Sequence, residues 1–508
     1  RQLTTGWSEG DGRTLFLVGD PMQSIYRFRK AEVSLFIDAW NGQLFDHIQL
    51  KPLQLTVNFR STKPIVDWVN QAFPLVMPTN SDPVMGAVHY SDASTKPGVS
   101  EEGCVEIAIL PDRDDEEEAK RIVEIIRQSG SDESIAVLVR SRDHASATLA
   151  ALDKLKAAEP RFRYQAIKFT RLSETIVIQD LVSLTLALIQ TADRLAWLAT
   201  LRTPFIGLDL ADLDAMVAGE AGNIIADAVA AVCFETNDEN VGLSDNGKQR
   251  LQRSGPILLQ AVEQRGRLPV RSIVESAWIS LGGPACVENA SELDDAATYF
   301  DLLDSLENEN LPIDRDTLDL RMQDLYAEPD SEADGKLQVL TIHSAKGLQF
   351  DTVILPGLNR GTGSDKGKLL HWFELPEQDS IVMSPMRNNE EKEKHKKSGD
   401  LIQFISNIEK KRQALEDGRL LYVACTRAIG RLFLSGAVKP TANDEINPVA
   451  GSLLQSLWPA IETEQTPLIS KAAESLQTHD EQTLEGEQES EKHHLNLPQI
   501  YRRLSADW

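Results

Sequence analysis

The chain has 508 residues, of which 41% are hydrophobic and 26% charged; this composition predicts a globular protein of about three domains, and no apolar run is long enough to cross a bilayer. Its net charge of −26 argues against indiscriminate nucleic-acid binding, so DNA would have to bind where positive charge is concentrated in a groove. The four cysteines are far apart with no CxxC pair, which argues against a zinc or iron–sulfur site and fits a reducing cytoplasm: Cys104, Cys233, Cys286 and Cys425.

Residues 15–36, LFLVGDPMQSIYRFRKAEVSLF, form the most informative stretch near the start of the chain. The apolar run at 15–18 predicts a short buried strand, residues 19–21 a turn, and a helix begins near Ala31. Aromatic residues alternate with arginines in between: Tyr26, Arg27, Phe28 and Arg29. This alternation suits stacking on bases and contacts to phosphates. A strand–turn–helix corner with surface aromatics is the simpler alternative.

The string GDPMQSIYRFR resembles motif III of the UvrD/Rep/RecB-type superfamily 1 DNA helicases. In that family the glutamine senses the terminal phosphate of ATP, and the aromatic residues stack on single-stranded DNA. The resemblance implies these roles for Gln23, Tyr26 and Phe28, and it places Arg29 on the DNA. It also implies that residues 1–50 are the end of a first RecA-like domain.

Residues 50–60, LKPLQLTVNFR, begin a second unit. Alternating apolar residues at 53, 55 and 57 predict a strand, and a helix is expected from Pro64 to Phe73. The NFRS that follows the strand resembles motif IV, whose arginine reaches the γ-phosphate and whose aromatic residue stacks on adenine. The resemblance implies these roles for Arg60 and Phe59. By itself, NFRS is more often a surface arginine at a strand end, and its position some thirty residues after motif III gives it weight.

The next part of the chain alternates strands and helices. Strands are predicted at 104–110 and 135–140, and helices at 115–128 and 141–155, after a long loop at 74–103. This order predicts a parallel sheet with helices on both faces, the α/β fold of a RecA-like domain. We assign 51–177 to the first part of the second RecA-like domain.

From about residue 178 the periodicity is almost entirely helical, and we assign 178–330 to a helical insertion. A plain helical bundle would give the same pattern. The resemblance implies the helical subdomain that interrupts the second RecA-like domain of these helicases. The segment TLRTPFIGLDLADL at 200–213 resembles one found in RecB-like members.

Residues 336–360, KLQVLTIHSAKGLQFDTVILPGLNR, place a polar turn between two strands. The turn resembles motif V, THxxKGLEF. The resemblance implies DNA contacts for His343 and Lys346 and nucleotide contacts for Gly347 and Gln349. The family often has glutamate, a ligand of the ribose, where this chain has Gln349, and an amide can still form a hydrogen bond.

Residues 361–400 are predicted to be a polar insertion or flexible loop, and 401–428 a helix. The segment LLYVACTRAIGRLFLSG at 420–436 resembles motif VI, YVxxTRA. The resemblance implies that Arg427 is a second γ-phosphate contact that acts as an arginine finger. We assign 331–436 to the second part of the second RecA-like domain. Residues 437–508 form an acidic linker or tail, with a helical patch at 447–462.

A GxxxxGK[ST] phosphate loop does not occur in the chain, nor does an acidic DExx motif before motif III. These elements cradle ATP and hold magnesium in the family, and both are expected upstream, outside this chain. We therefore expect that ATP and Mg²⁺ are the cofactors of a longer protein and that this chain alone does not hydrolyse ATP.

Together the motifs identify the chain as a portion of a UvrD-type helicase, closest to a RecB- or AddA-like member of an exonuclease V. The resemblance implies 3′-to-5′ translocation on single-stranded DNA, action at junctions with duplex, partner subunits in a helicase–nuclease complex, and double-strand-break repair. A non-catalytic DNA-binding scaffold in such a complex is the main alternative, and the phosphate loop would decide between them. A protein-interaction module built on residues 178–330 is a third possibility.

Overall fold

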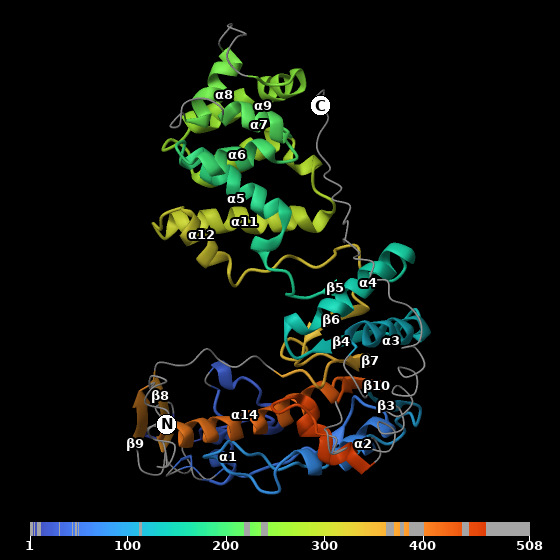
Figure 1. The fold of residues 1–508 in the computed structure, drawn as a ribbon. Coiled ribbons are helices and arrows are strands. Elements are labelled where there is room, and N and C mark those ends of the chain that lie inside the picture. Colours follow the sequence, from blue (N-terminus) through green and yellow to red (C-terminus); the bar gives the residue numbers. More distant parts are fainter. Residues whose placement is uncertain are drawn as a thin grey trace, which may run out of the picture. The chain divides into compact units, whose positions relative to one another are not determined.

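The computed structural model describes residues 4, 6–7, 12–29, 31–42, 44–45, 48, 50–110, 114–217, 224–234, 242–361, 370–375, 380–385, 401–438 and 447–463. The chain divides into two compact units (Figure 1). Of the described residues, the first unit contains those up to Tyr164 and those from Gly335 to 463, and the second contains those from Gln165 to Asp334. The second unit thus contains the stretch in which a helical insertion was predicted.

A parallel sheet organises the first unit. Its strands lie in the order β3 (Cys104–Leu110), β10 (Ala428–Ala437), β7 (Phe350–Leu355), β4 (Ile135–Val139) and β6 (Leu337–Thr341), and each pair is parallel. All five residues of β4 are buried, because an inner strand of such a sheet is covered on both faces. The predicted α/β fold is confirmed.

Helices surround this sheet (Figure 1). The helix α2 (Lys63–Val76) packs against β3 and β10, and α3 (Asp115–Gln128) packs against α4 (Ser146–Ala158). The short 3-10 helix η4 (Arg142–Ala145) precedes α4. The long helix α14 (Leu401–Cys425) leads directly into β10, and Gly418 does not interrupt it. A further helix over residues 453–463 lies in the predicted helical patch.

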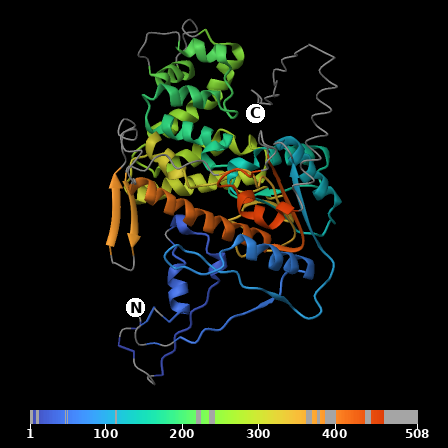
Figure 2. The same ribbon diagram turned by 60° about the horizontal axis from the view of Figure 1, so that its bottom comes forward.

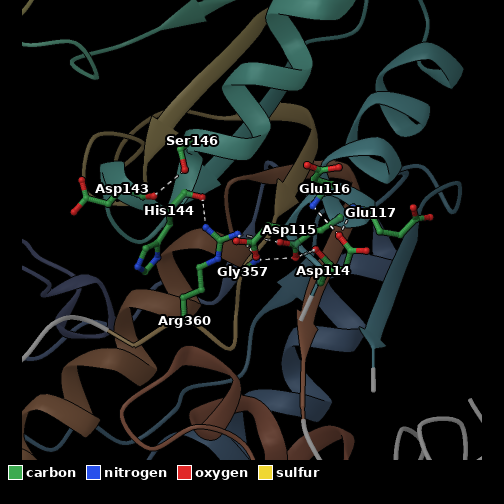
Figure 3. A network of polar contacts seen from close by, with 11 residues as sticks. Asp114, Asp115, Glu116, Glu117, Asp143, His144, Ser146, Gly357 and Arg360 are labelled. Carbon is green, nitrogen blue, oxygen red and sulfur yellow. Dashed lines mark hydrogen bonds and ion pairs between the residues drawn. The ribbon is translucent and has the colours of Figure 1, made fainter. Parts of the chain in front are cut away.

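A polar network ties α3 to the carboxyl ends of β7 and β4 (Figure 3). The buried guanidinium of Arg360, in the loop after β7, lies 2.9 Å from Asp115 Oδ1 and 3.6 Å from Glu118 Oε2. Its Nη1 donates to the carbonyl of His144, and Glu118 Oε1 accepts from the amide of Gly357. A largely buried ion pair is stable only when its remaining donors and acceptors are satisfied, and these bonds satisfy them.

The start of the chain differs from the prediction. Residues 12–20 have no regular structure, and Phe16 is 82% exposed, so the buried strand predicted at 15–18 is absent. The strand predicted around residues 53–57 is reduced to β1 (Val57–Asn58), which pairs with β2 (Ser94–Thr95) and leaves Leu55 94% exposed. A strand needs a neighbour to satisfy its backbone, and no other strand of the described residues lies beside these segments. Between residue 20 and β1 lie the 3-10 helices η2 (Pro21–Gln23) and η3 (Arg27–Arg29) and the helix α1 (Ser34–Trp40).

Of the two alternatives predicted for residues 361–400, a polar insertion or a flexible loop, the described part of this stretch agrees with an insertion. The strands β8 (Leu370–Leu375) and β9 (Ser380–Pro385) form an antiparallel hairpin beside α14 (Figure 2). Phe373 is buried, and the guanidinium carbon of Arg412 on α14 lies 4.6 Å from its ring centroid. The basic run at 392–397 and the predicted linker beyond residue 463 lie outside the described residues.

The second unit is almost entirely helical. After β5 (Gln165–Ala166) and η5 (Leu172–Glu174) come α5 (Ile176–Ile189), α6 (Arg194–Arg202), α7 (Leu210–Val217), α8 (Ile225–Phe234), α9 (Asp245–Glu263), α10 (Val270–Ser280), η6 (Gly283–Ala285), α11 (Ala290–Asn308) and α12 (Arg315–Met322). α5 and α6 are separate helices because Asp193 caps α6, accepting a bond from the amide of Ala196. In its core, the buried Tyr299 hydroxyl donates to Thr185 Oγ1 at 2.9 Å. No helix within the described ranges is both long and apolar enough to cross a membrane.

Asp180, on α5, gives a pH-dependent prediction for this unit. Burial raises the pKa of its carboxyl to about 7. The unfolded chain therefore loses this proton near pH 4 and the folded unit only near pH 7, so stability falls as pH rises across this window. Asp180→Asn should raise the melting temperature by about 5 °C at pH 8 and leave it unchanged near pH 4. Thermal unfolding followed by circular dichroism at several pH values checks this, and a pH-independent difference would contradict it.

Candidate nucleotide and DNA site

Arg60 connects motifs IV, V and VI. It lies just after β1, where Asn58 Oδ1 accepts a bond from the Arg60 amide at 2.8 Å and fixes the turn. Arg60 Nη1 donates to the carbonyl of Thr426 at 3.2 Å, and Nε donates to Gln349 Oε1 at 3.1 Å. Three segments far apart in sequence thus meet at one half-buried guanidinium.

Arg427 lies beside this group, just beyond the end of α14. Its side chain is completely buried, and it donates to the carbonyls of Val423 and Leu348 at 3.0 and 3.1 Å. Burial, and then the nearby charge of Arg60, lowers the pKa of Arg427 to about 10. Within the described part of the chain, neither arginine forms an ion pair with a carboxylate. Two neighbouring cations without a carboxylate partner favour an anion.

Gln23 is held at the end of η2. Asp20 caps this short helix, accepting from the amide of Met22 at 2.9 Å through Oδ1 and from Gln23 Nε2 at 2.7 Å through Oδ2. Asp20 is close enough to Arg427 to raise its pKa, in opposition to the effect of burial. The structure therefore places the motif III turn near Arg427, while the Gln23 amide itself contacts Asp20.

Gly347 and Phe59 are two further residues that were predicted to contact the nucleotide. Gly347 adopts φ +91°, a left-handed conformation that strongly favours glycine, and this conformation forms the turn after β6. Phe59, adjacent to Arg60, is 74% exposed. An aromatic ring left in water beside a guanidinium is suited to stack on a base.

The predicted DNA residues gather around Tyr26. Its ring centroid lies 6.1 Å from that of His343, and its hydroxyl donates to the His343 carbonyl at 3.3 Å. Lys346 Nζ is 4.9 Å and Arg29 Cζ is 5.8 Å from the Tyr26 ring centroid. Burial lowers the pKa of His343, which favours its neutral form at pH 7. The structure thus brings together one aromatic ring and two cations, and the Phe28 side chain lies outside the described set.

Sequence reasoning missed a group of buried charges on α14. Glu416, Asp417 and Arg419 are all buried shortly before motif VI. The sequence did contain a signal for these buried charges, because they directly precede the apolar run at 420–425, at positions where α14 faces the interior. Their partners are hundreds of residues away and could not be read from periodicity.

No group of three or more His, Cys, Asp or Glu residues in the described ranges could hold a metal ion. The candidate site therefore consists of arginines, amides and aromatic rings, which fit a triphosphate, an adenine and DNA bases. These groups can bind and orient a nucleotide and neutralise charge on its phosphates.

Comparison with known proteins identifies the family of the chain. The family model of the UvrD-like helicase C-terminal domain matches residues 53–439, and that of the UvrD/REP helicase N-terminal domain matches residues 2–41. The A component of the ATP-dependent helicase/nuclease of Lactobacillus acidophilus is 27% identical over 481 residues, covering 84% of this chain and 37% of that protein. Its counterpart of the same name in Geobacillus thermodenitrificans is 28% identical over 516 residues, covering 90% and 39%. The chain thus spans less than two-fifths of these relatives. Since the first match includes most of the sequence, the chain belongs to the UvrD-like helicase family.

Proposed function

We propose that this chain contributes the second RecA-like domain and the end of the first to an ATP-dependent DNA helicase. The observation that carries this proposal is the pair Arg60 and Arg427, which share one site without a carboxylate partner among the described residues. A γ-phosphate would relieve their mutual repulsion and accept hydrogen bonds from both guanidinium groups.

On the nucleotide side, each residue has a distinct task. Arg427 neutralises the charge that develops on the transferred phosphoryl group, and Arg60 holds a phosphate oxygen. Gln23 senses the terminal phosphate, Phe59 stacks on adenine, and Gly347 and Gln349 bring the motif V turn to the nucleotide. Mg²⁺ would be held by carboxylates outside this chain and would supply further charge neutralisation.

On the DNA side, Tyr26 and Phe28 stack on bases of single-stranded DNA. Lys346 and Arg29 attract the adjacent phosphates, and His343 positions the Tyr26 hydroxyl. Opening and closing of the nucleotide site then moves the strand past these rings. Translocation in the 3′-to-5′ direction and unwinding of duplex follow the family pattern.

The names of the relatives support a more specific assignment. Both are named as the A component of an ATP-dependent helicase/nuclease. We therefore propose that the parent protein belongs to a cytoplasmic helicase–nuclease complex that acts at DNA ends in double-strand-break repair.

The test compares the full-length protein with this chain in a single-strand-stimulated ATPase assay. We expect activity in the full-length protein and none in this chain, which has no phosphate loop and leaves the apolar residues Phe16 and Leu55 exposed. Activity in neither protein would contradict the motor and favour the scaffold alternative. Activity in this chain alone would contradict the expected upstream location of the phosphate loop. Capture of partner proteins by the helical unit without any DNA binding by the whole chain would favour an interaction module.

A further inference from the structure

Three charged side chains on one stretch of α14 are buried just before motif VI. Glu416, Asp417 and Arg419 are 7%, 2% and 5% exposed. A buried charge costs several kcal/mol unless it is paired or hydrogen-bonded. Asp417 is paired with Arg140, whose Nη2 lies 2.7 Å from its Oδ1. The other two side chains bond to backbone groups of the motif III segment instead.

Arg419 and Glu416 hold both ends of the short segment that carries Tyr26. Arg419 Nε donates to the carbonyl of Ser24 at 2.7 Å, and the amide of Arg27 donates to Glu416 Oε1 at 3.1 Å. Tyr26 lies between these two anchored backbone groups. We call Glu416 and Arg419 the clamp. The clamp fixes the position of the Tyr26 ring through the backbone on either side of it, and not by covering the ring.

Electrostatics supports the clamp. Burial lowers the pKa of Arg419, and the neighbouring charge of Glu416 opposes that effect. Arg419 Nη1 donates in addition to the carbonyl of Gly86 at 2.6 Å, and Arg412 on the same helix donates to the carbonyl of Val84. The helix thus holds the turn at 82–87 as well as the motif III segment.

The same helix ends at the nucleotide site. α14 terminates at Cys425, six residues after Arg419 and about 9 Å further along the helix axis, and Arg427 lies two residues beyond that end. Both views show the motif III segment beside α14 (Figures 1 and 2). Arg427 Nε donates to the carbonyl of Val423 on α14, so Arg427 is bonded to the helix that carries Glu416 and Arg419.

We propose that Glu416 and Arg419 are positioning residues that couple Arg427, at the γ-phosphate, to Tyr26, on the DNA. Neither residue touches nucleotide or DNA in this scheme. The inference rests on the proposed function, because it requires both sites to be active. Without the clamp, ATP hydrolysis continues at its basal rate but no longer responds fully to DNA.

The experiment uses the full-length protein with Arg419→Lys, Glu416→Ala, Glu416→Gln and Asp417→Asn. Lysine keeps the charge of Arg419 but has one nitrogen in place of the planar guanidinium, so it does not reproduce the positions of Nε and Nη1 at the two carbonyls. Glutamine keeps an oxygen that can accept from the Arg27 amide, and alanine does not. Asp417→Asn is the matched control, because it weakens a buried ion pair on the same helix without touching motif III.

Arg419→Lys and Glu416→Ala should lower the ratio of DNA-stimulated to basal ATPase rate by about tenfold, with the basal rate within about twofold of wild type. Glu416→Gln should retain most of the stimulation. Asp417→Asn should lower the melting temperature and leave the ratio unchanged. An unchanged ratio in folded Arg419→Lys and Glu416→Ala proteins, or an equal loss in the control, overturns the proposal.

Hydrogen exchange distinguishes this failure from failure of the proposed function. The Arg27 amide should exchange faster in Glu416→Ala, because it loses its acceptor. Faster exchange of the Arg27 amide together with full DNA stimulation of the ATPase would show that the clamp exists but does not couple the two sites. That result would overturn this inference and leave the proposed function standing. A wild-type protein whose ATPase does not respond to DNA overturns the proposed function, and the inference that rests on it falls as well.

Discussion

Arg427→Ala is expected to lower the DNA-stimulated ATPase rate of the full-length protein by about three orders of magnitude. The guanidinium is buried beside Arg60 with a depressed pKa, and stabilising the charge of the transferred phosphoryl group would use this positive charge. Because such a contact strengthens in the transition state, the loss should fall on kcat more than on KM for ATP. Phosphate release at saturating single-stranded DNA, measured over a range of ATP concentrations, gives both constants.

Arg431→Ala is the matched control for this prediction. Arg431 lies four residues further along, on β10, where its Nε donates to Thr352 Oγ1 at 2.9 Å and its guanidinium pairs with Glu133. Its loss should reduce stability slightly and leave the ATPase rate within about twofold of wild type. An ATPase rate that survives Arg427→Ala would refute the arginine-finger assignment.

Tyr26→Ala is expected to weaken binding of an oligo-dT strand by about 5- to 150-fold, as the loss of 1–3 kcal/mol of base stacking predicts. The Tyr26 ring lies near two cations that attract the phosphates on either side of a stacked base. Fluorescence anisotropy with a labelled oligonucleotide measures the affinity. The double variant Tyr26→Ala, Phe28→Ala should in addition lose unwinding. Two causes would give this loss: the variant no longer holds the strand, or ATP hydrolysis continues but no longer moves the strand.

Tyr26→Phe separates stacking from hydrogen bonding. It keeps the ring and removes the hydroxyl that donates to the His343 carbonyl. We expect its affinity for single strands to lie within about fivefold of wild type, since the lost bond is worth about 1 kcal/mol or less. If the double alanine variant unwound duplex DNA at the wild-type rate, the assignment of both rings to DNA stacking would be wrong.

Local periodicity could predict the elements of the central sheet closely. The predicted strand at 104–110 and helix at 115–128 match the bounds of β3 and α3, because alternation and the acidic first turn encode them locally. The segment at 15–18 has the same apolar character but forms no strand, because a strand depends on partners that local sequence does not supply. The two strands of the hairpin β8–β9 pair locally, but its packing against α14 is tertiary, and the sequence pattern did not reveal the hairpin.

The candidate site was predictable in its residue types but not in its connections. Motif resemblance pointed to Arg60, Gln349 and Arg427, and the structure shows how they meet through one guanidinium and the carbonyl of Thr426. The contact between Glu416 and the Arg27 amide joins residues 389 positions apart. No local pattern encodes such a contact, so the clamp on motif III could emerge only from the folded chain.

The pairing of β4 with β6 has a consequence for folding. Ile135 pairs with Leu337, although the whole helical unit Gln165–Asp334 lies between them in sequence. Closing a flexible loop of that length costs on the order of 4–5 kcal/mol in chain entropy. Within the helical unit, however, Gln165 Nε2 donates to the carbonyl of Ala333, so its two ends lie side by side once it is folded. Early folding of the helices therefore shortens the effective loop, and the sheet can form as though the insertion were a tight connection.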